Sequence, residues 1–322
     1  MHRVRVGVVR GGPSHEYEVS LRTGAEVLQH LPSEKYHAKD IFIDTSGVWH
    51  HQGRPVEPIS VLRQVDVVFN ALHGTYGEDG QIQRLMDTVG VRYTGSKALG
   101  SAFAMNKLRA KDIAKTAGLK TPGSVELVVS STHAGDLVRA FKTFAPPLVV
   151  KPAHSGSSVG VSLPRTFAAF EDAVRAAFEI SPRVLVEEYI QGKEATVGVL
   201  EHFRSEPLYA MLPIEIVPKT GSSFFDYDAK YKGNSEERCP GNFTKDETYE
   251  LSRLAKSIHE ALGLRHYSRS DFIIHSKRGI FYLETNTLPG LTSESLVPKA
   301  LKAVGCEFPD FLDHLLTLAL HR

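Results

Sequence analysis

The residues best suited to metal chemistry lie near the end of the chain, after an apolar run. Glu284 and Asn286 stand two apart, and residues two apart on an extended strand point to the same face. A carboxylate and an amide oxygen on one face form half of a hard-oxygen site of the kind that Mg²⁺ prefers, and Mg²⁺ usually accompanies nucleotide phosphates. Arg269 and Asp271 have the same spacing further upstream. Together these residues predict two neighbouring strands that direct three metal ligands and a cation into one site.

The alternative for these positions is a pair of ordinary half-exposed strand faces, because polar alternation is routine on such sheets. The residues that flank Asp271 and Glu284 are strongly apolar, which indicates buried strands. A buried carboxylate needs a partner, so the metal site is the favoured interpretation.

A second segment places a lysine at a strand end before a loop of small residues. Lys151 follows the apolar run 148–150 and precedes residues 152–160, which are rich in Ser and Gly. Small residues let backbone N–H groups approach a phosphate, and the lysine adds a charge. The segment is not a Walker P-loop, because the lysine precedes the glycines. A tight β-hairpin turn is the alternative.

Three further features are weaker. Glu187, Glu188 and Tyr189 end an apolar run, which indicates either an adenine slot against an aromatic ring or an ordinary interdomain turn. The polar and aromatic connection 218–243 is typical of a lid or of a surface loop. A lone Glu16 or His73 at a loop is more often structural than functional.

The elements that must position these residues alternate between strands and helices, which predicts an α/β protein. A strand at 3–9, a helix at about 15–30 and a strand at 65–72 predict a small doubly wound unit that ends near residue 100. Glu16 and His73 then fall at the carboxyl ends of its strands, where functional loops belong. Further helices are expected at 104–117, 132–144, 166–178, about 245–262 and the C-terminus, and further strands at 148–152, 184–190 and within 194–217.

Composition predicts a soluble, cytoplasmic enzyme. The 322 residues allow two or three domains, and 42% apolar and 23% charged residues are ordinary for a globular protein. A formal net charge of +1 gives no reason to expect a nucleic-acid or membrane partner. Two cysteines are too few for a disulfide framework or a cysteine zinc site. We expect no signal peptide and no membrane span, because no apolar run approaches about 20 residues.

The ordered set of segments resembles the D-alanine–D-alanine ligases of the ATP-grasp superfamily. Single motifs are weak, but their joint order and spacing are highly specific; they are Gly11–Ser20, His73–Gly80, Tyr93–Ser96, Met105–Lys107, Lys151–Gly160, Asp228–Tyr231, Arg269–Asp271 and Glu284–Ser295. The resemblance implies a three-domain ATP-grasp architecture with ATP held between the central and C-terminal α+β domains. The implied domains are a Rossmann-like substrate domain at 1–100, a central domain at 101–188 and a catalytic domain at 189–322.

The resemblance also implies the reaction and its cofactors. Two D-alanines would be ligated through a D-alanyl phosphate, with release of ADP and phosphate, for peptidoglycan precursor synthesis in the cytoplasm. The protein would act as a homodimer on small-molecule substrates. ATP would be bound with two Mg²⁺ or Mn²⁺ ions, held by Asp271, Glu284 and Asn286.

The implied nucleotide site is extensive. Lys107 and Lys151 would hold the α- and β-phosphates, Glu187 and the backbone at Tyr189 or Ile190 the adenine, and Glu194 the ribose. Ser158, Phe225 and Leu283 would complete the site.

The implied substrate site has several roles. Glu16 would pair with the first ammonium group, Ser157 and Tyr231 would link Glu16 to the closing loop, and Lys230 would reach the γ-phosphate. Arg269 and the Gly290 N–H would stabilise the oxyanion. Ser295 and the Leu296 N–H would receive the second carboxylate, and His73 would lie near the first one.

The sequence departs from the family pattern at two places. Asn106 stands where the family usually has Asp before the lysine, and residues 153–155 fill the phosphate loop unusually. Neither departure removes a group that the mechanism needs.

Three rival functions stay open: a D-alanine–D-lactate ligase, another ATP-grasp carboxylate–amine ligase and an inactive nucleotide-binding module. Lactate-type ligases often have His where Tyr231 stands, so Tyr231 favours D-alanine. Retention of the three metal-type ligands together with Arg269 and Lys230 argues against the inactive module.

Overall fold

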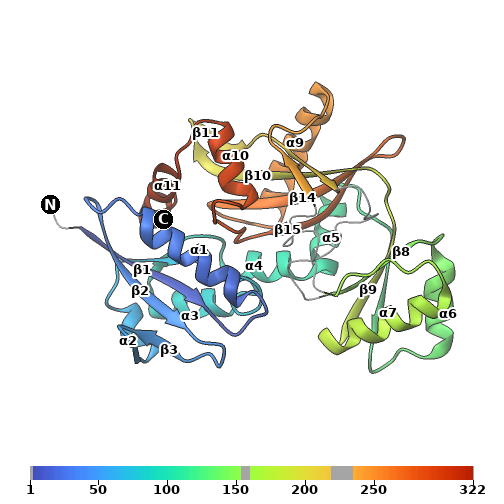
Figure 1. The fold of residues 1–322 in the computed structure, drawn as a ribbon, viewed down its shortest axis with the longest axis horizontal. Coiled ribbons are helices and arrows are strands. Elements are labelled where there is room, and N and C mark those ends of the chain that lie inside the picture. Colours follow the sequence, from blue (N-terminus) through green and yellow to red (C-terminus); the bar gives the residue numbers. More distant parts are fainter. Residues whose placement is uncertain (1–2, 154–159, 219–234, 322) are drawn as a thin grey trace.

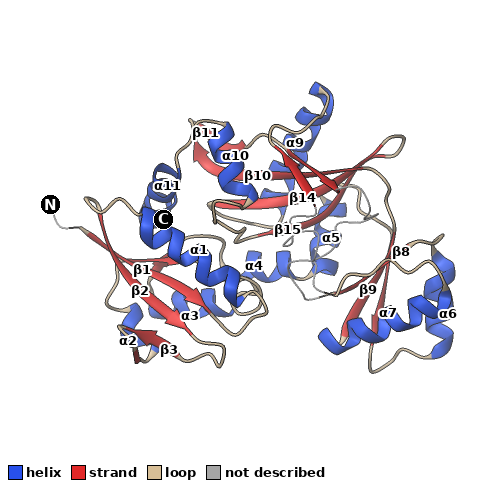
Figure 2. Cartoon of the chain, viewed as in Figure 1, coloured by secondary structure: helices blue, strands red, loops and turns tan. Residues whose placement is uncertain are grey.

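The structure is a computed structural model that describes residues 3–153, 160–218 and 235–321. Helices and strands alternate along the chain and form three β-sheets with helical covers, which confirms the predicted α/β class (Figure 2). The first sheet and the three-stranded sheet lie toward opposite ends of the long axis, and the third sheet lies between them (Figure 1). No helix in the described ranges is long and apolar enough to span a membrane.

The first sheet is mainly parallel and has the strand order β4-β3-β2-β1-β5-β6. Parallel strands are buried on both faces, which explains the continuous apolar run in which Val6, Val8 and Val9 are fully buried. As predicted, Glu16 and His73 follow the carboxyl ends of two adjacent parallel strands, β1 and β5. The elements of this unit are β1 (Val4–Gly11), α1 (Tyr17–His30), β2 (Tyr36–Ile43), β3 (Trp49–His51), β4 (Arg54–Pro55), α2 (Pro58–Leu62), β5 (Val67–Asn70), α3 (Gln81–Val89) and β6 (Arg92–Tyr93).

The three-stranded sheet is antiparallel, with the order β7-β9-β8. The predicted strand that carries Lys151 and the one that carries Glu187 are confirmed as neighbours in it. Phenylalanines at helical spacing on α7 bury one face of that helix against the sheet, as the sequence predicted. The elements are β7 (Ser124–Val128), α6 (Ala134–Thr143), β8 (Leu148–Pro152), α7 (Phe167–Ile180) and β9 (Arg183–Glu188).

The third sheet has the order β13-β12-β10-β14-β15, with β11 paired to β10. Helix α9 begins at a capping box in which Thr244 and Glu247 satisfy each other's backbone N–H groups. The expected connection 218–243 is wrong near its end, because β13 pairs with β12 and extends the sheet. The elements are β10 (Lys193–Phe203), β11 (Glu206–Ala210), β12 (Ile214–Pro218), β13 (Ser235–Arg238), α9 (Lys245–Ala261), β14 (Tyr267–His275) and β15 (Gly279–Asn286).

The helix predicted over 104–117 is interrupted at Asn106, which separates α4 (Ala98–Met105) from α5 (Lys107–Thr116). Asn106 leaves the helical region at φ −84° and ψ 100°, and its side-chain oxygen accepts the Arg109 N–H at 3.1 Å. Asn and Asp are equally good N-caps, so the family's Asp is replaced without loss of the cap. Both helices pack against β15 of the third sheet. The division into domains at residues 100 and 188 stays a prediction.

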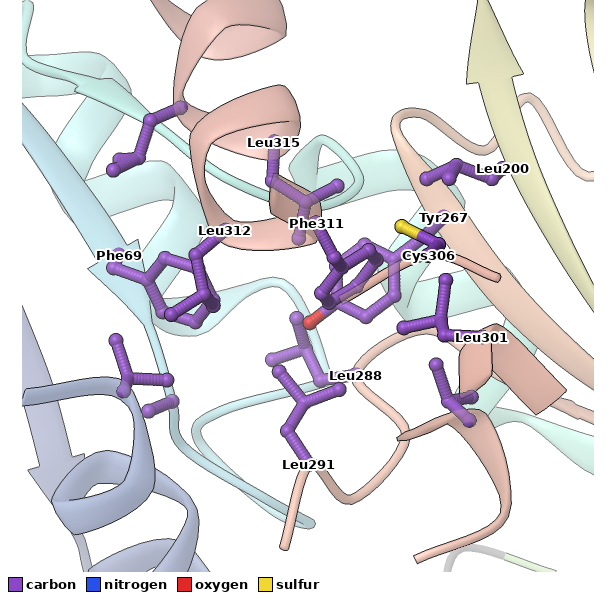
Figure 3. Close-up of a cluster of buried hydrophobic side chains, with 14 of the residues drawn as sticks. Phe69, Leu200, Tyr267, Leu288, Leu291, Leu301, Cys306, Phe311, Leu312 and Leu315 are labelled. Atoms are coloured by element: carbon purple, nitrogen blue, oxygen red, sulfur yellow. The ribbon is translucent and has the colours of Figure 1, made fainter. Parts of the chain in front are cut away.

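The last two helices, α10 (Leu296–Ala303) and α11 (Phe308–His321), return the chain to the first sheet. Helix α11 packs on β5, β6 and α1. Figure 3 shows the resulting cluster, in which Phe69 of β5 and Tyr267 of β14 lie on either side of Phe311 and Leu312. Each fully buried side chain of this kind contributes about 1.5–3 kcal/mol, so the cluster holds the first and third sheets together.

Candidate active site

A cavity of about 1060 Å³, including space open to solvent, lies between the three-stranded sheet and the third sheet. Its walls come from both sheets, from the linker between β9 and β10, and from α5 and α10. All the predicted nucleotide-binding residues in the described ranges line it: Lys107, Lys151, Glu187, Tyr189, Ile190, Glu194 and Leu283. Five other predicted site residues lie outside the described ranges: Ser157, Ser158, Phe225, Lys230 and Tyr231.

Strands β14 and β15 bring the three metal-type side chains together: Asp271 and Glu284 line this cavity, and Asn286 lies beside Asp271. The strands are antiparallel, with Asp271 directly opposite Glu284 and Arg269 opposite Asn286. Asn286 Nδ2 lies 3.4 Å from Asp271 Oδ2. The predicted juxtaposition of two neighbouring strands is therefore confirmed, whereas the metal that these ligands would hold stays a prediction.

An irregularity in the pairing of β14 with β15 shapes this wall. Asp271 pairs with Glu284 and Phe272 with Tyr282, so Leu283 of β15 has no residue opposite it on β14. Successive residues of a regular strand point to opposite faces, but a bulge can turn two neighbours to the same side. Leu283 and Glu284 accordingly both line the cavity, one apolar and one charged.

The acidic side chains at this wall already have protein partners. Arg269 donates to Asp271 through Nε at 3.0 Å and Nη2 at 2.9 Å, a two-pronged contact with the carboxylate. Thr196 of β10 donates its hydroxyl to Asp271 Oδ1 at 2.5 Å. Lys107 Nζ lies 3.4 Å from Glu284 Oε2. The sequence did not indicate Thr196, although its position opposite Asp271 in the sheet makes the contact direct.

A buried group of two lysines and one glutamate lies deeper in the cavity wall. Glu187 pairs with Lys151 at 3.0 Å and with Lys111 at 2.8 Å. Burial alone would raise the pKa of Glu187, but the charges of Lys111 and Lys151 outweigh it and lower that pKa. Burial lowers the pKa of Lys111 to about 8, and Glu187 limits the decrease. Lys111 was not among the residues predicted from the sequence, although it stands four residues after Lys107 on the same face of α5.

Most charged side chains around the cavity are paired. Among the described residues, the lining contains three cations, Lys107, Lys151 and Arg269, and five carboxylates: Glu187, Glu188, Glu194, Asp271 and Glu284. Two cations outside the lining pair with it, Lys111 with Glu187 and Arg278 with Glu188. Burial and the nearby Asp271 raise the pKa of Glu194 to about 7, which removes part of its charge. A polyphosphate entering such a cavity needs additional positive charge, and hard-oxygen ligands suit divalent cations. Asp271, Glu284 and Asn286 thus fit magnesium or manganese.

Of the other predicted substrate residues in the described ranges, Arg269 and Leu296 line this cavity, whereas Glu16, His73, Gly290 and Ser295 do not. Glu16 precedes α1. A Cβ added at Gly74, where φ is +70°, would lie 2.7 Å from Glu16 Oε2, so this close approach requires glycine. Ser14 donates its hydroxyl to the carbonyl of His73 and accepts the N–H of Glu16, which fixes the two loops against each other.

The segment after β15 carries Gly290, Ser295 and Leu296. Ser295 precedes α10, and its Oγ lies 2.8 Å from Thr292 Oγ1 and accepts the Thr292 N–H at 3.2 Å. A Cβ at Gly290 would lie 2.8 Å from Ser295 Oγ, so glycine lets the two residues approach. The segment is therefore compact, and Leu296 at its end reaches the cavity lining.

His73 is buried between α1 and the segment after β15, and both of its ring nitrogens have protein partners. Nδ1 lies 2.8 Å from the Leu288 carbonyl, and Nε2 lies 2.8 Å from Thr23 Oγ1. Burial lowers the pKa of His73. Its expected place near the first substrate's carboxylate stays a prediction.

Comparisons with known proteins agree over the whole chain. The family model described as D-ala D-ala ligase N-terminus matches residues 5–60 and 50–96, and the one described as D-ala D-ala ligase C-terminus matches residues 113–317. A D-alanine–D-alanine ligase from Geotalea uraniireducens is 40% identical over 316 residues, covering 98% of this chain and 95% of that protein.

Solved structures give the same result. The VanG D-Ala:D-Ser ligase from Enterococcus faecalis superposes with a TM-score of 0.87 at 31% identity, covering 99% of this chain and 100% of that one. The D-alanine–D-alanine ligase from Bacillus anthracis gives a TM-score of 0.83 at 30% identity, covering 99% and 98% of the two chains. These proteins share the fold described above.

Proposed function

Since the chain belongs to the D-alanine–D-alanine ligase family, we infer that it catalyses the ATP-dependent ligation of two D-alanines for cell-wall precursor synthesis. The observation that carries this conclusion at the site is the opposed pair Asp271 and Glu284 in the wall of the cavity between two sheets, with Asn286 beside Asp271. Two strands of one sheet thus supply hard-oxygen ligands where a phosphate chain would end.

The first chemical requirement is activation of a carboxylate, which is a poor electrophile toward an amine. Phosphorylation of the first D-alanine to D-alanyl phosphate provides a leaving group. Lys107 and Lys151 would bind the nucleotide phosphates, exchanging Glu284 and Glu187 for phosphate oxygens. Supporting this role, both ammonium groups already border the cavity and are largely screened from water.

The metal site follows from the ligand set. We propose that Asp271, Glu284 and Asn286 hold two Mg²⁺ or Mn²⁺ ions, because adjacent strands bring their hard-oxygen groups together and a polyphosphate adds negative charge that needs cations. Such ions neutralise charge that develops on the transferring phosphoryl group. Arg269 and Thr196 would keep Asp271 oriented toward them.

The adenosine end of the nucleotide would lie against the linker between β9 and β10. Glu187 would accept a hydrogen bond from the adenine amino group, the backbone at Tyr189 or Ile190 would meet the ring edge, and Glu194 would hold the ribose. Leu283 supplies apolar surface, and Ser158 and Phe225 would complete this part of the site.

The second requirement is amide formation. Glu16 would hold the ammonium group of the first D-alanine, and Ser295 with the Leu296 N–H would receive the carboxylate of the second. The free amine of the second D-alanine would attack the acyl carbon, Arg269 with the Gly290 N–H would stabilise the oxyanion, and collapse of that intermediate would expel phosphate and leave the amide. Ser157 and Tyr231 would link Glu16 to a closing loop whose Lys230 reaches the γ-phosphate.

The remaining assignments are also part of the proposal. The chain would be cytoplasmic and homodimeric, with substrate, central and catalytic domains at 1–100, 101–188 and 189–322. A neighbour described as a D-Ala:D-Ser ligase superposes closely, so the choice of second substrate needs its own test.

The deciding experiment measures ADP release with ATP, Mg²⁺ and D-alanine as the only amino acid, and identifies the product by mass spectrometry. We expect D-alanyl-D-alanine and one ADP for each dipeptide. Competition with D-serine and D-lactate at pH 6 and pH 8 tests the second substrate. Absence of ADP release with D-alanine alone refutes the proposal. If the product that contains D-serine or D-lactate exceeds D-alanyl-D-alanine at both pH values, the assigned second substrate is wrong.

A further inference from the structure

The backbone of Leu288 is held through both its N–H and its carbonyl by one loop of the first sheet. The Leu288 N–H donates to Glu78 Oε2 at 3.1 Å, and the Leu288 carbonyl meets His73 Nδ1 at 2.8 Å. His73 and Glu78 both belong to the loop between β5 and α3, more than 200 residues away in the sequence. A hydrogen-bonded clamp therefore joins this loop to the segment that follows β15.

Glu78 grips the same segment through further donors. Its Oε2 also accepts the N–H and the hydroxyl of Thr287, each at 3.2 Å, and its Oε1 accepts the Gly74 N–H at 3.1 Å. Glu78 and Thr287 are buried, so water does not replace these bonds if they break. A buried donor left without an acceptor costs about 1–3 kcal/mol, which makes the carboxylate a strong constraint on this backbone.

The chemistry of the imidazole follows from its neighbours. The Leu288 carbonyl can only accept a hydrogen bond, so His73 Nδ1 must carry the proton. Because burial lowers the pKa of His73, the ring is neutral, and Nε2 accepts the Thr23 hydroxyl. The ring is thereby fixed as a donor to the Leu288 carbonyl.

The side chain of Leu288 is constrained as well. It belongs to the cluster that joins the first and third sheets, close to Leu291 (Figure 3). A Cβ at Gly95 would lie 2.9 Å from its Cδ2, so Leu288 packs directly on the first sheet's side. Backbone and side chain together fix the start of the segment that carries Gly290 and Ser295.

We propose that His73 and Glu78 are positioning residues that hold the Leu288 backbone, and through it the segment 287–295, in place for the amide-forming step. This inference rests on the proposed ligase function for the step that it serves. Gly290 is two residues beyond the clamped peptide, and an oxyanion donor works only when it is held in place before the reaction. No described residue before Lys107 lines the nucleotide cavity, so the clamp acts on the amino-acid side of the site.

Four variants test the clamp. In His73→Asn the amide nitrogen takes the place of Nδ1 and keeps a donor to Leu288, whereas His73→Ala removes it. Glu78→Gln must turn its NH₂ group toward the donors of Thr287 and Leu288 or toward that of Gly74. Glu215→Gln is the matched control, a buried carboxylate that accepts the Asn242 N–H away from this segment.

The first readout is hydrogen–deuterium exchange of a peptide spanning 287–295, without substrates. We expect about tenfold faster exchange in His73→Ala and Glu78→Gln, a smaller increase in His73→Asn and none in Glu215→Gln. Unchanged exchange in His73→Ala and Glu78→Gln overturns the clamp, whatever the enzyme does. Because this measurement uses no substrate, it decides the clamp even if the ligase function itself fails.

The second readout is steady-state ligation together with ATP binding. We expect kcat for dipeptide formation to fall about 10²-fold in His73→Ala and Glu78→Gln, with partial recovery in His73→Asn and ATP affinity within twofold of the unmodified chain. Equal losses in His73→Asn and His73→Ala would assign the imidazole to substrate contact through Nε2 and refute the positioning role. A parallel loss of ATP affinity would refute it as well.

Discussion

Replacing Lys111 by methionine tests the buried charge group behind the nucleotide cavity. Lys111 is 1% exposed and lies 2.8 Å from Glu187 Oε1. Methionine is unbranched and of similar length, so it fills the space without the charge. Removing one partner of a buried ion pair costs about 3–5 kcal/mol. Since Lys151 still pairs with Glu187 at 3.0 Å, we expect a smaller loss in the free energy of unfolding, about 2–3 kcal/mol.

The same change should weaken ATP binding. With Lys111 gone, Lys151 is the one cation left beside Glu187 among the described residues, and its transfer to a phosphate would leave a buried carboxylate without that partner. We expect the Kd for ATP to rise roughly tenfold, which corresponds to about 1.4 kcal/mol. Urea denaturation measures the first effect and isothermal titration calorimetry with Mg²⁺–ATP measures the second.

The matched control is Lys115→Met, one turn further along α5, where the lysine is exposed. It removes the same charge from the same helix without touching Glu187, so it should change neither quantity by more than about 0.5 kcal/mol. If Lys111→Met leaves stability and ATP affinity at the level of this control, the reasoning from the buried pair is refuted.

Three further changes have defined outcomes. Glu284→Gln removes a metal-type carboxylate and should lower turnover at least about 100-fold with an unchanged circular dichroism spectrum; near-normal ADP release would contradict the metal assignment. Asn106→Ala should cost about 1 kcal/mol in urea denaturation and Asn106→Asp almost nothing, because only alanine loses the cap of α5; equal costs would refute the cap. Burial lowers the pKa of His259 to about 4, so the unfolded chain binds a proton that the folded chain does not. Stability should therefore fall between pH 6.5 and 4 by on the order of 3 kcal/mol at most, and His259→Gln should flatten that slope; an unchanged slope would rule out His259 as its source.

Local patterns in the sequence were sufficient for the two strands that carry the metal-type side chains. Alternation and apolar flanks predicted that Asp271 and Glu284 lie on adjacent buried strands, and the structure pairs them directly. The phosphate-type lysine at the end of β8 and the linker after β9 also follow from short runs of sequence. Such features depend on neighbours within a few residues, which a single sequence displays.

The missed features depend on contacts between distant segments. Nothing near Thr196 or Lys111 in the sequence identifies Asp271 or Glu187 as their partners, because sheet register and helix packing create those contacts. The bulge at Leu283 is equally hidden, since the same letters could form a regular strand. The return of α11 to the first sheet is also a long-range property, fixed by burial of an amphipathic helix on the apolar surface available.

The ion pairs of the site explain how the protein stays folded with these charged side chains around a cavity before any ligand binds. Lys107 with Glu284 and Lys151 with Glu187 are each largely screened from water, and a buried charge without a partner would cost several kcal/mol. Under the proposed function, a phosphate that takes a lysine leaves a carboxylate behind, and that carboxylate needs a new cation. At Glu284 a divalent ion would fill this need, and at Glu187 Lys111 already does. Lys111 would therefore allow Lys151 to transfer from Glu187 to a phosphate without a metal ion. Transfer of Lys107 from Glu284 would instead require a metal ion, so nucleotide binding there would depend on the metal.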